Sequence, residues 1–107
     1  MSDFVRINRD ILYTEWGSDA CTLSVFVHCL LKANLESGKQ WGKDYKRGQF
    51  ITNLQVLARE LGDSTKNIDK ALQRLVSFDE LKVETPGQYY RITVKDFEKY
   101  LPENGEE

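Results

Sequence analysis

The stretch LARELGDSTKNIDKALQRL, residues 57–75, decides the expected fold of this chain. Apolar side chains recur at helical spacing on both sides of Gly62, and glycine tolerates the left-handed backbone in which many helices end. Ser64 or Thr65 can cap the second run by accepting a hydrogen bond from a free backbone N–H. The stretch therefore predicts two short helices joined by a tight turn, the first over about residues 53–61.

The side chains that would meet between these two helices have suitable sizes. Ala58 is small where the helices would cross closely, and Ile68 is branched where the second helix would pack onto the first. We expect Thr52 or Asn53 to cap the first helix and the second helix to end at about Val76. The expected inner faces are Leu54, Leu57, Ala58 and Leu61 in the first helix, and Ile68, Ala71, Leu72 and Leu75 in the second.

Short strands are predicted on either side of this helix pair. KRGQFIT (46–52) has a turn glycine followed by two apolar residues, which favours a short strand. ELKVETPGQYYRITV (80–94) alternates apolar and polar residues on both sides of Pro86–Gly87, which predicts a hairpin. The segment VKDFEKYL (94–101) then predicts a short helix or helical turn. Its expected inward side chains are Phe97, Tyr100 and Leu101.

A longer helix is predicted upstream, over GSDACTLSVFVHCLLKAN (17–34), with Ser18 or Asp19 as its cap. One side carries Leu23, Phe26, Val27, Leu30 and Leu31, and the other carries Cys21, Val25 and Cys29. A helix that is apolar on two sides must bury both. The N-terminal segment 3–16 and the C-terminal helix are candidate covers, and a second copy of the chain is the alternative. Residues 35–49 are expected to be a polar connection.

The order of helix, short strand, helix, turn, helix and hairpin predicts an α+β fold of the winged helix-turn-helix type. It would have a three-helix core, a small antiparallel sheet or wing, an extra N-terminal segment and a short C-terminal helix. The length suits one domain, residues 1–101, with 102–107 as a flexible acidic tail or the start of a linker. Neither a signal peptide nor a run of roughly 18 apolar residues is present, which favours the cytoplasm.

The second helix of the pair carries the side chains that point to a function. With its apolar face inward, the step of about 100° per residue turns Lys66, Lys70, Gln73 and Ser77 outward. Lysine and arginine can bind guanine edges, and glutamine and asparagine can pair with adenine. The residues predicted to bind DNA are Thr65, Lys66, Asn67, Lys70, Gln73 and Arg74. The alternative is an ordinary solvated helix face.

Further basic and polar residues lie on the predicted strands and are candidates for contacts with the DNA backbone. They are Lys46, Arg47, Lys82, Gln88 and Arg91, and exposed strand charges are the alternative interpretation. Asp69, at the edge of the helix face, can accept from cytosine N4, repel phosphate, or pair with Lys66 or Arg59. Trp41 and Tyr45 are expected to cover the core, and of Tyr89 and Tyr90 one is expected to be buried and the other exposed.

The pattern predicts no catalytic, metal or cofactor site. His28 stands next to Cys29, but adjacent positions on a helix diverge by about 100° and do not face each other. Cys21 and Cys29 would lie roughly 12 Å apart on one helix, too far for a disulfide. No glycine-rich phosphate-binding loop is present. The sequence therefore favours a non-enzymatic protein.

The chain resembles the winged-helix domain of DnaD-like and phage replisome-organiser proteins through the runs FVRINRDIL (4–12), LLKAN (30–34), KRGQFITNLQVLARELGDSTKNIDKALQRL (46–75) and YYRITVKDFEKY (89–100), and through Trp41. The resemblance covers nearly the whole chain. It implies a DNA-binding domain used in replication initiation or by a mobile element, with double-stranded DNA and replication proteins as partners and self-association of the chain. Proteins of that group continue into a second helical domain, so the sequence is expected to be a stand-alone module or a fragment.

Two other functions remain alternatives to DNA binding in replication. A net charge of −2 and the presence of Asp69 favour a winged-helix protein-interaction or dimerisation module with little or no DNA binding. A dimer would form through the N-terminal segment or the first long helix. A transcriptional regulator with the same fold is the other alternative.

Overall fold

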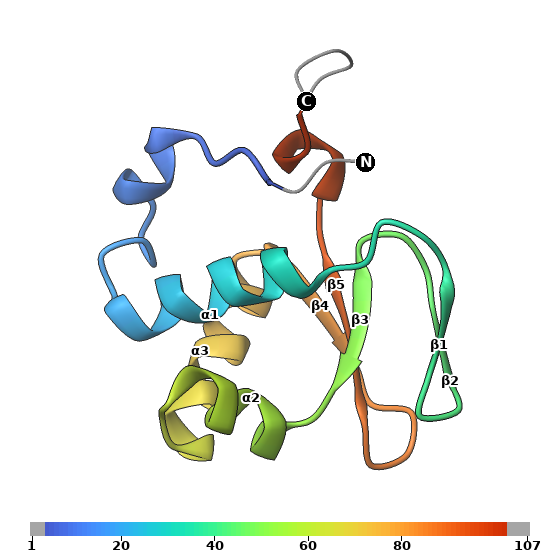
Figure 1. Ribbon diagram of the computed structural model, residues 1–107. Helices are drawn as coiled ribbons and strands as arrows, with labels where there is room; N and C mark the ends of the chain where they lie inside the picture. The colour runs from blue at the N-terminus through green and yellow to red at the C-terminus, as the bar shows by residue number, and fades with distance from the viewer. Residues whose placement is uncertain (1–3, 103–107) are drawn as a thin grey trace.

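The structure is a computed structural model that describes residues 4–102 (Figure 1). Its helices are the 3₁₀ helix η1 (Arg9–Tyr13), α1 (Ala20–Lys32), α2 (Leu54–Leu61), α3 (Thr65–Ser77) and the 3₁₀ helix η2 (Phe97–Tyr100). Its strands are β1 (Gly38–Gln40), β2 (Lys43–Tyr45), β3 (Gln49–Thr52), β4 (Leu81–Glu84) and β5 (Tyr90–Val94). The predicted α+β class is confirmed. All of the predicted tail except Pro102 lies outside the described residues.

Residues 4–102 form two antiparallel sheets, one of β1 and β2 and one in the order β3-β5-β4. Figure 1 shows α1, α2 and α3 to one side of the three-stranded sheet, with the β1–β2 hairpin beyond β3 on the other side. Ile92 in the central strand lies opposite Phe50 on β3 and Val83 on β4. Because alternate strand residues point to the same face, these side chains join the helices in one core. Its completely buried members include Val25, Phe26, Cys29, Leu57, Leu75 and Ile92.

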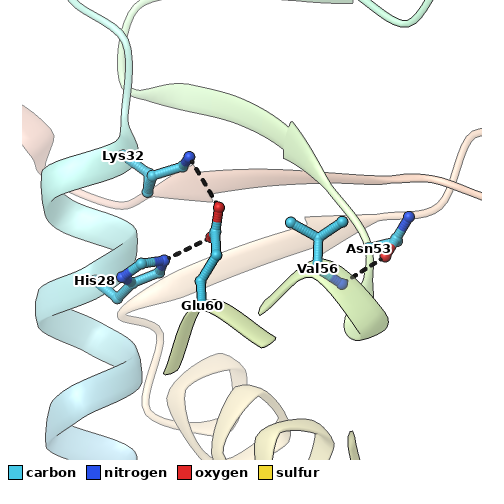
Figure 2. A network of polar contacts seen from close by, with 5 residues as sticks. All are labelled: His28, Lys32, Asn53, Val56 and Glu60. Atoms are coloured by element: carbon cyan, nitrogen blue, oxygen red, sulfur yellow. Dashed lines mark hydrogen bonds and ion pairs between the residues drawn. The ribbon is translucent and has the colours of Figure 1, made fainter. Parts of the chain in front are cut away.

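The predicted helix pair and its caps are confirmed. Asn53 Oδ1 accepts from the Val56 N–H at 2.9 Å, which satisfies a free donor at the start of α2 (Figure 2). Gly62 ends α2 in the left-handed conformation with φ 69°. Ser64 Oγ accepts from the Asn67 N–H at 3.1 Å at the start of α3. These local signals depend only on neighbouring residues, which is why the sequence was sufficient to find them.

Helix α1 is capped by Asp19 as expected, but its buried face differs from the predicted one. The buried residues are Thr22, Val25, Phe26, Cys29 and Leu30, a stripe that runs between the two sides predicted to be apolar. Leu31, expected to face the core, is 63% exposed. Val25 and Cys29 are covered by the chain's own core, in which α1 packs against α3, so this side needs no second copy.

An ion-pair cluster joins α1 to α2. Glu60 Oε1 lies 2.8 Å from His28 Nε2, and Glu60 Oε2 lies 3.4 Å from Lys32 Nζ (Figure 2). Figure 2 shows both α1 side chains pointing at the same carboxylate of α2. The cluster therefore places His28 in a structural contact between two helices.

Residues 35–49, expected to be a polar connection, contain the β1–β2 hairpin instead. Gln40 pairs with Lys43, so Trp41 and Gly42 form a two-residue turn, with φ 54° and 75°. Two positive φ values are typical of a type I′ turn, whose usual signal is Asn-Gly or Asp-Gly rather than Trp-Gly. The hairpin was missed because this turn has an unusual first residue.

The aromatic residues near this hairpin also differ from expectation. Neither Trp41 nor Tyr45 belongs to the core cluster, and Tyr89 and Tyr90 are both half-buried. Tyr90 packs against the core, whereas Tyr89 packs against Trp41. The alternation rule failed for the two tyrosines because Tyr89 belongs to the loop before β5, where the period of two no longer applies.

The N-terminal segment and η2 complete the molecule. The Arg6 N–H donates to the Tyr100 carbonyl at 2.6 Å. The ring of Phe26 packs against that of Trp16, which precedes it in sequence, and that of Tyr100, which follows it, with centroid distances of 5.0 and 5.6 Å. Phe97 and Tyr100 are buried as predicted, and Leu101 is partly buried. Across residues 4–102, every helix is too short or too polar to span a lipid bilayer.

Candidate nucleic-acid interface

Helix α3 carries the surface that was predicted to contact DNA. The expected inner residues Ile68, Ala71, Leu72 and Leu75 are all buried. Burying this stripe turns the opposite side of the helix to solvent. All six predicted DNA-binding side chains are exposed: Thr65, Lys66, Asn67, Lys70, Gln73 and Arg74.

Three cations follow one another along α3 at intervals of four residues, Lys66, Lys70 and Arg74. Residues four apart lie on the same side of a helix. Within residues 4–102, none of the three takes part in an ion pair. Lys70 and Arg74 also line a cleft of about 200 Å³ between α3 and the start of α1, which includes Asp19. The pKa of Asp19 is lowered mainly by the hydrogen bond from the Thr22 hydroxyl, with a smaller contribution from the charge of Arg74.

The two amides on this face are held by carboxylates one turn earlier. Gln73 Nε2 donates to Asp69 Oδ2 and Asn67 Nδ2 donates to Asp63 Oδ1, both at 2.8 Å. The Asn67 bond, together with the Ser64 N–H, holds the pKa of Asp63 below its usual value. Asp69 thus pairs with neither of the cations suggested for it. Each amide keeps its carbonyl oxygen and a second N–H for a base, but the bond to the carboxylate restricts how the side chain can turn.

The strand residues predicted to contact the DNA backbone fall into two groups. Lys46, Lys82 and Gln88 are exposed. Arg47 instead holds Glu98 through two bonds, Nε to Oε2 at 2.6 Å and Nη2 to Oε1 at 3.2 Å, and its Nη1 donates to the carbonyl of Leu35. This pair lowers the pKa of Glu98 and ties the segment before β3 to η2.

Arg91 is also engaged within the protein. Its Nε donates to the Asp44 carbonyl at 2.8 Å, and its Nη1 lies 3.8 Å from Glu84 Oε1. Arg47 and Glu98 lie 51 residues apart in sequence, and Arg91 and Asp44 lie 47 apart, and no local pattern indicates either of these two contacts. These oxygens therefore compete with a phosphate for both guanidinium groups.

Sequence reasoning missed an aromatic contact between the tips of the two hairpins. The rings of Trp41 in the β1–β2 turn and Tyr89 in the β4–β5 loop have centroids 5.0 Å apart and planes inclined at 34°. The local signal was the segment Lys39–Lys43, KQWGK, in which lysines flank a glycine turn. Nothing in that segment indicates which distant residue the indole contacts.

The two cysteines lie in different surroundings on α1. Burial in the core raises the pKa of the Cys29 thiol to about 12. Burial and the neighbouring Asp63 carboxylate raise the pKa of Cys21, whose Sγ lies 3.6 Å from Asp63 Oδ2. Both thiols are thus held in the protonated form, which is the poorer nucleophile.

No protein-family model, no curated protein and no solved structure matches this chain.

Proposed function

We propose that this protein is a non-enzymatic winged-helix module that binds double-stranded DNA by inserting α3 into the major groove. The β4–β5 hairpin, residues 81–94, acts as the wing and meets the backbone or the minor groove. By its resemblance to DnaD-like and phage replisome-organiser proteins, we assign the module to replication initiation on a chromosome or a mobile element, alongside other replication proteins.

The observation that carries this proposal is the exposed row of Lys66, Lys70 and Arg74 on α3. The major groove of B-DNA is about 12 Å wide and admits one helix. A helix that follows a tight turn and precedes a two-stranded hairpin is the element that winged-helix proteins place there. Three cations on that helix that form no ion pair with any residue between 4 and 102 suit the phosphates and guanine edges of the groove.

The affinity is expected to be micromolar or weaker for the isolated monomer. The chain has a net charge of −2, and each DNA phosphate that it neutralises releases only about 0.9 of a counterion, which limits the gain in affinity. Arg47 and Arg91 are held by protein partners, so among the residues predicted to contact DNA the cations that remain available are those of α3 together with Lys46 and Lys82. Binding is therefore expected to weaken steeply as salt is added.

The test is titration of a fluorescently labelled duplex at low salt with the wild type and with a Lys66→Ala/Lys70→Ala/Arg74→Ala variant. We expect the triple variant to lose at least tenfold in affinity and to show a shallower dependence of log Kd on log salt, by about 0.9 for each phosphate contact removed. Unchanged duplex binding by the folded triple variant would rule out this face.

A matched control is the triple variant Arg9→Ala/Lys95→Ala/Lys99→Ala, which removes the same total charge from other elements. Arg9 lies on η1, Lys99 lies on η2, and Lys95 lies just before η2. Because both triple variants have the same net charge, a difference between them reports position rather than overall electrostatics. Equal losses in the two variants would indicate that the duplex is held by nonspecific charge alone.

A protein-interaction module is the second candidate. The residues that favour it are exposed and apolar, and they lie on the N-terminal segment and α1: Phe4, Ile7, Leu12, Tyr13 and Leu31. Phe4 and Leu31 line one cleft with Leu35 and Leu101, and contiguous exposed apolar surface of this kind marks association sites in soluble proteins. Concentration-dependent mass in light scattering, beside a failed duplex titration at low salt, would favour this candidate. A selected binding site in a promoter would instead favour a transcriptional regulator with the same fold.

A further inference from the structure

The tip of the β1–β2 hairpin carries a large aromatic residue in a conformation that such residues rarely adopt. Trp41 has φ 54°, in the left-handed region that glycine, asparagine and aspartate populate far more readily. The indole is nevertheless 46% exposed, so the strain is not offset by burial in the core. An unfavourable backbone conformation that positions an exposed side chain is a reason to look for a ligand.

The neighbouring β4–β5 loop holds this indole from one side. Tyr89 packs against it at 5.0 Å, and Arg91 Nε donates to the Asp44 carbonyl in β2 at 2.8 Å. Figure 1 shows the two hairpins ending next to each other, away from α1 and η2. The indole is thus fixed in direction and one of its sides is supported, while nearly half of its surface faces solvent.

The charges around this aromatic pair are mostly positive. Lys39 and Lys43 lie on the two strands of the hairpin and Lys46 follows it, and Asp44 is the only acidic residue between positions 37 and 49. Asp44 Oδ1 is 4.0 Å from Lys39 Nζ, and both side chains are strongly exposed. The Lys43 amino group lies near Gly87 at the tip of the other hairpin. A flat aromatic surface flanked by lysines is the chemistry that binds a base and its phosphates together.

We propose that Trp41, supported by Tyr89 and flanked by Lys43, is a stacking site for an unpaired nucleobase of single-stranded nucleic acid. An unpaired strand fits better than a duplex because the base faces inside a duplex are covered by their neighbours, whereas unpaired bases are free to stack on aromatic side chains. The site lies outside α3 and does not depend on duplex binding by that helix, although Tyr89 belongs to the β4–β5 hairpin proposed as the wing. It would give the protein a contact with the strand that is exposed when DNA is opened.

The probe is an oligothymidylate of about ten nucleotides, with tryptophan fluorescence as the readout. The chain has two tryptophans, and Trp16 is 2% exposed, so quenching by a stacked base reports Trp41. We expect quenching that saturates, and about tenfold weaker binding by fluorescence anisotropy for Trp41→Leu, which keeps an apolar contact with Tyr89 but has no ring. Trp41→Phe should retain more of the binding while losing the quenching signal.

Three controls separate stacking from charge and from misfolding. An abasic oligomer of the same length keeps the phosphates and should bind as weakly to the wild type as oligothymidylate binds to Trp41→Leu. Tyr13→Leu removes an aromatic ring that is 84% exposed on η1 and should leave binding unchanged. The α3 triple variant should still bind oligothymidylate, so failure of the duplex proposal does not affect this test.

The proposal is overturned by any of three results. These are the absence of saturable quenching by oligothymidylate at low salt, equal affinity of wild type and Trp41→Leu, and equal affinity for the abasic and normal oligomers. If Trp41→Leu lowers the unfolding midpoint in urea without changing oligomer affinity, the aromatic pair serves only to lock the two hairpins together.

Discussion

Thr52, at the end of β3, has a buried side chain whose Oγ1 has no hydrogen-bond partner among the described residues. A buried polar group without a partner costs roughly 1–3 kcal/mol relative to its solvated state. We therefore expect Thr52→Val, which has nearly the same shape, to raise the free energy of unfolding by about 1 kcal/mol in urea denaturation.

Thr93 on the neighbouring strand provides the control for this prediction. Its Oγ1 accepts from Gln49 Nε2 at 3.0 Å, so Thr93→Val removes a satisfied hydrogen bond and should lower stability by about 1 kcal/mol. Opposite signs for the two substitutions are the expected result. A loss of stability in Thr52→Val would mean that its hydroxyl has a partner, such as a water molecule.

At the scale of the element, Gly62 determines where α2 ends and α3 begins. It has φ 69°, and a Cβ added there would meet no atom within 4 Å. The cost of Gly62→Ala is therefore conformational rather than steric, and we expect it to lower the free energy of unfolding by about 1 kcal/mol in urea. Gly62→Asn should cost less, because asparagine tolerates this conformation. Equal losses for the two variants would contradict a purely backbone origin.

Apolar periodicity predicted helix α1 itself but not its buried face. The pattern found the helix and its Asp19 cap correctly, but it did not identify which of two apolar sides faces the core. The buried stripe lies between those sides because α1 packs against α3 along a line set by the whole assembly. The β1–β2 hairpin was missed for a related reason, since its Trp41–Gly42 turn lacks the usual residues and its indole packs on a distant loop.

At the scale of the whole molecule, carboxylates in several places couple folding to pH. The pKa values of Asp19, Glu60, Asp63 and Glu98 all lie below their ordinary values. Because each carboxyl ionises more readily in the folded protein, the stability it contributes is present above its ordinary pKa, near 4, and is lost as the pH falls through the lowered value. The protein is therefore expected to lose stability progressively in acid.

Glu60→Gln isolates one of these groups. The hydrogen bond with His28, followed by the interactions with Lys32, lowers the pKa of Glu60. Since the pair is partly exposed, we expect the variant to be less stable by at most about 1 kcal/mol at pH 7, and the difference to be smaller at pH 3, below the ordinary pKa of a glutamate. Urea denaturation of both proteins at the two pH values measures this. A difference that is the same at both values would show that packing, not charge, is responsible.

The elements that local sequence was able to specify are those whose signals lie within a few residues. This class includes the caps at Asn53 and Ser64, the glycine between α2 and α3, and the apolar stripe of α3. The apolar stripe in turn fixes the outward position of Lys66, Lys70 and Arg74. They follow from the geometry of a helix and its unsatisfied end groups, which neighbouring residues alone can satisfy.

Packing between distant segments decided the rest. It pairs Arg47 with Glu98 and Arg91 with the Asp44 carbonyl, so these two predicted phosphate-binding residues are engaged within the protein. Packing also determines which face of α1 lies against α3, and it places Trp41 in contact with Tyr89. The physical reason is that each of these contacts joins residues far apart in the chain, and their distance in space is set by the closure of the whole core rather than by any local pattern.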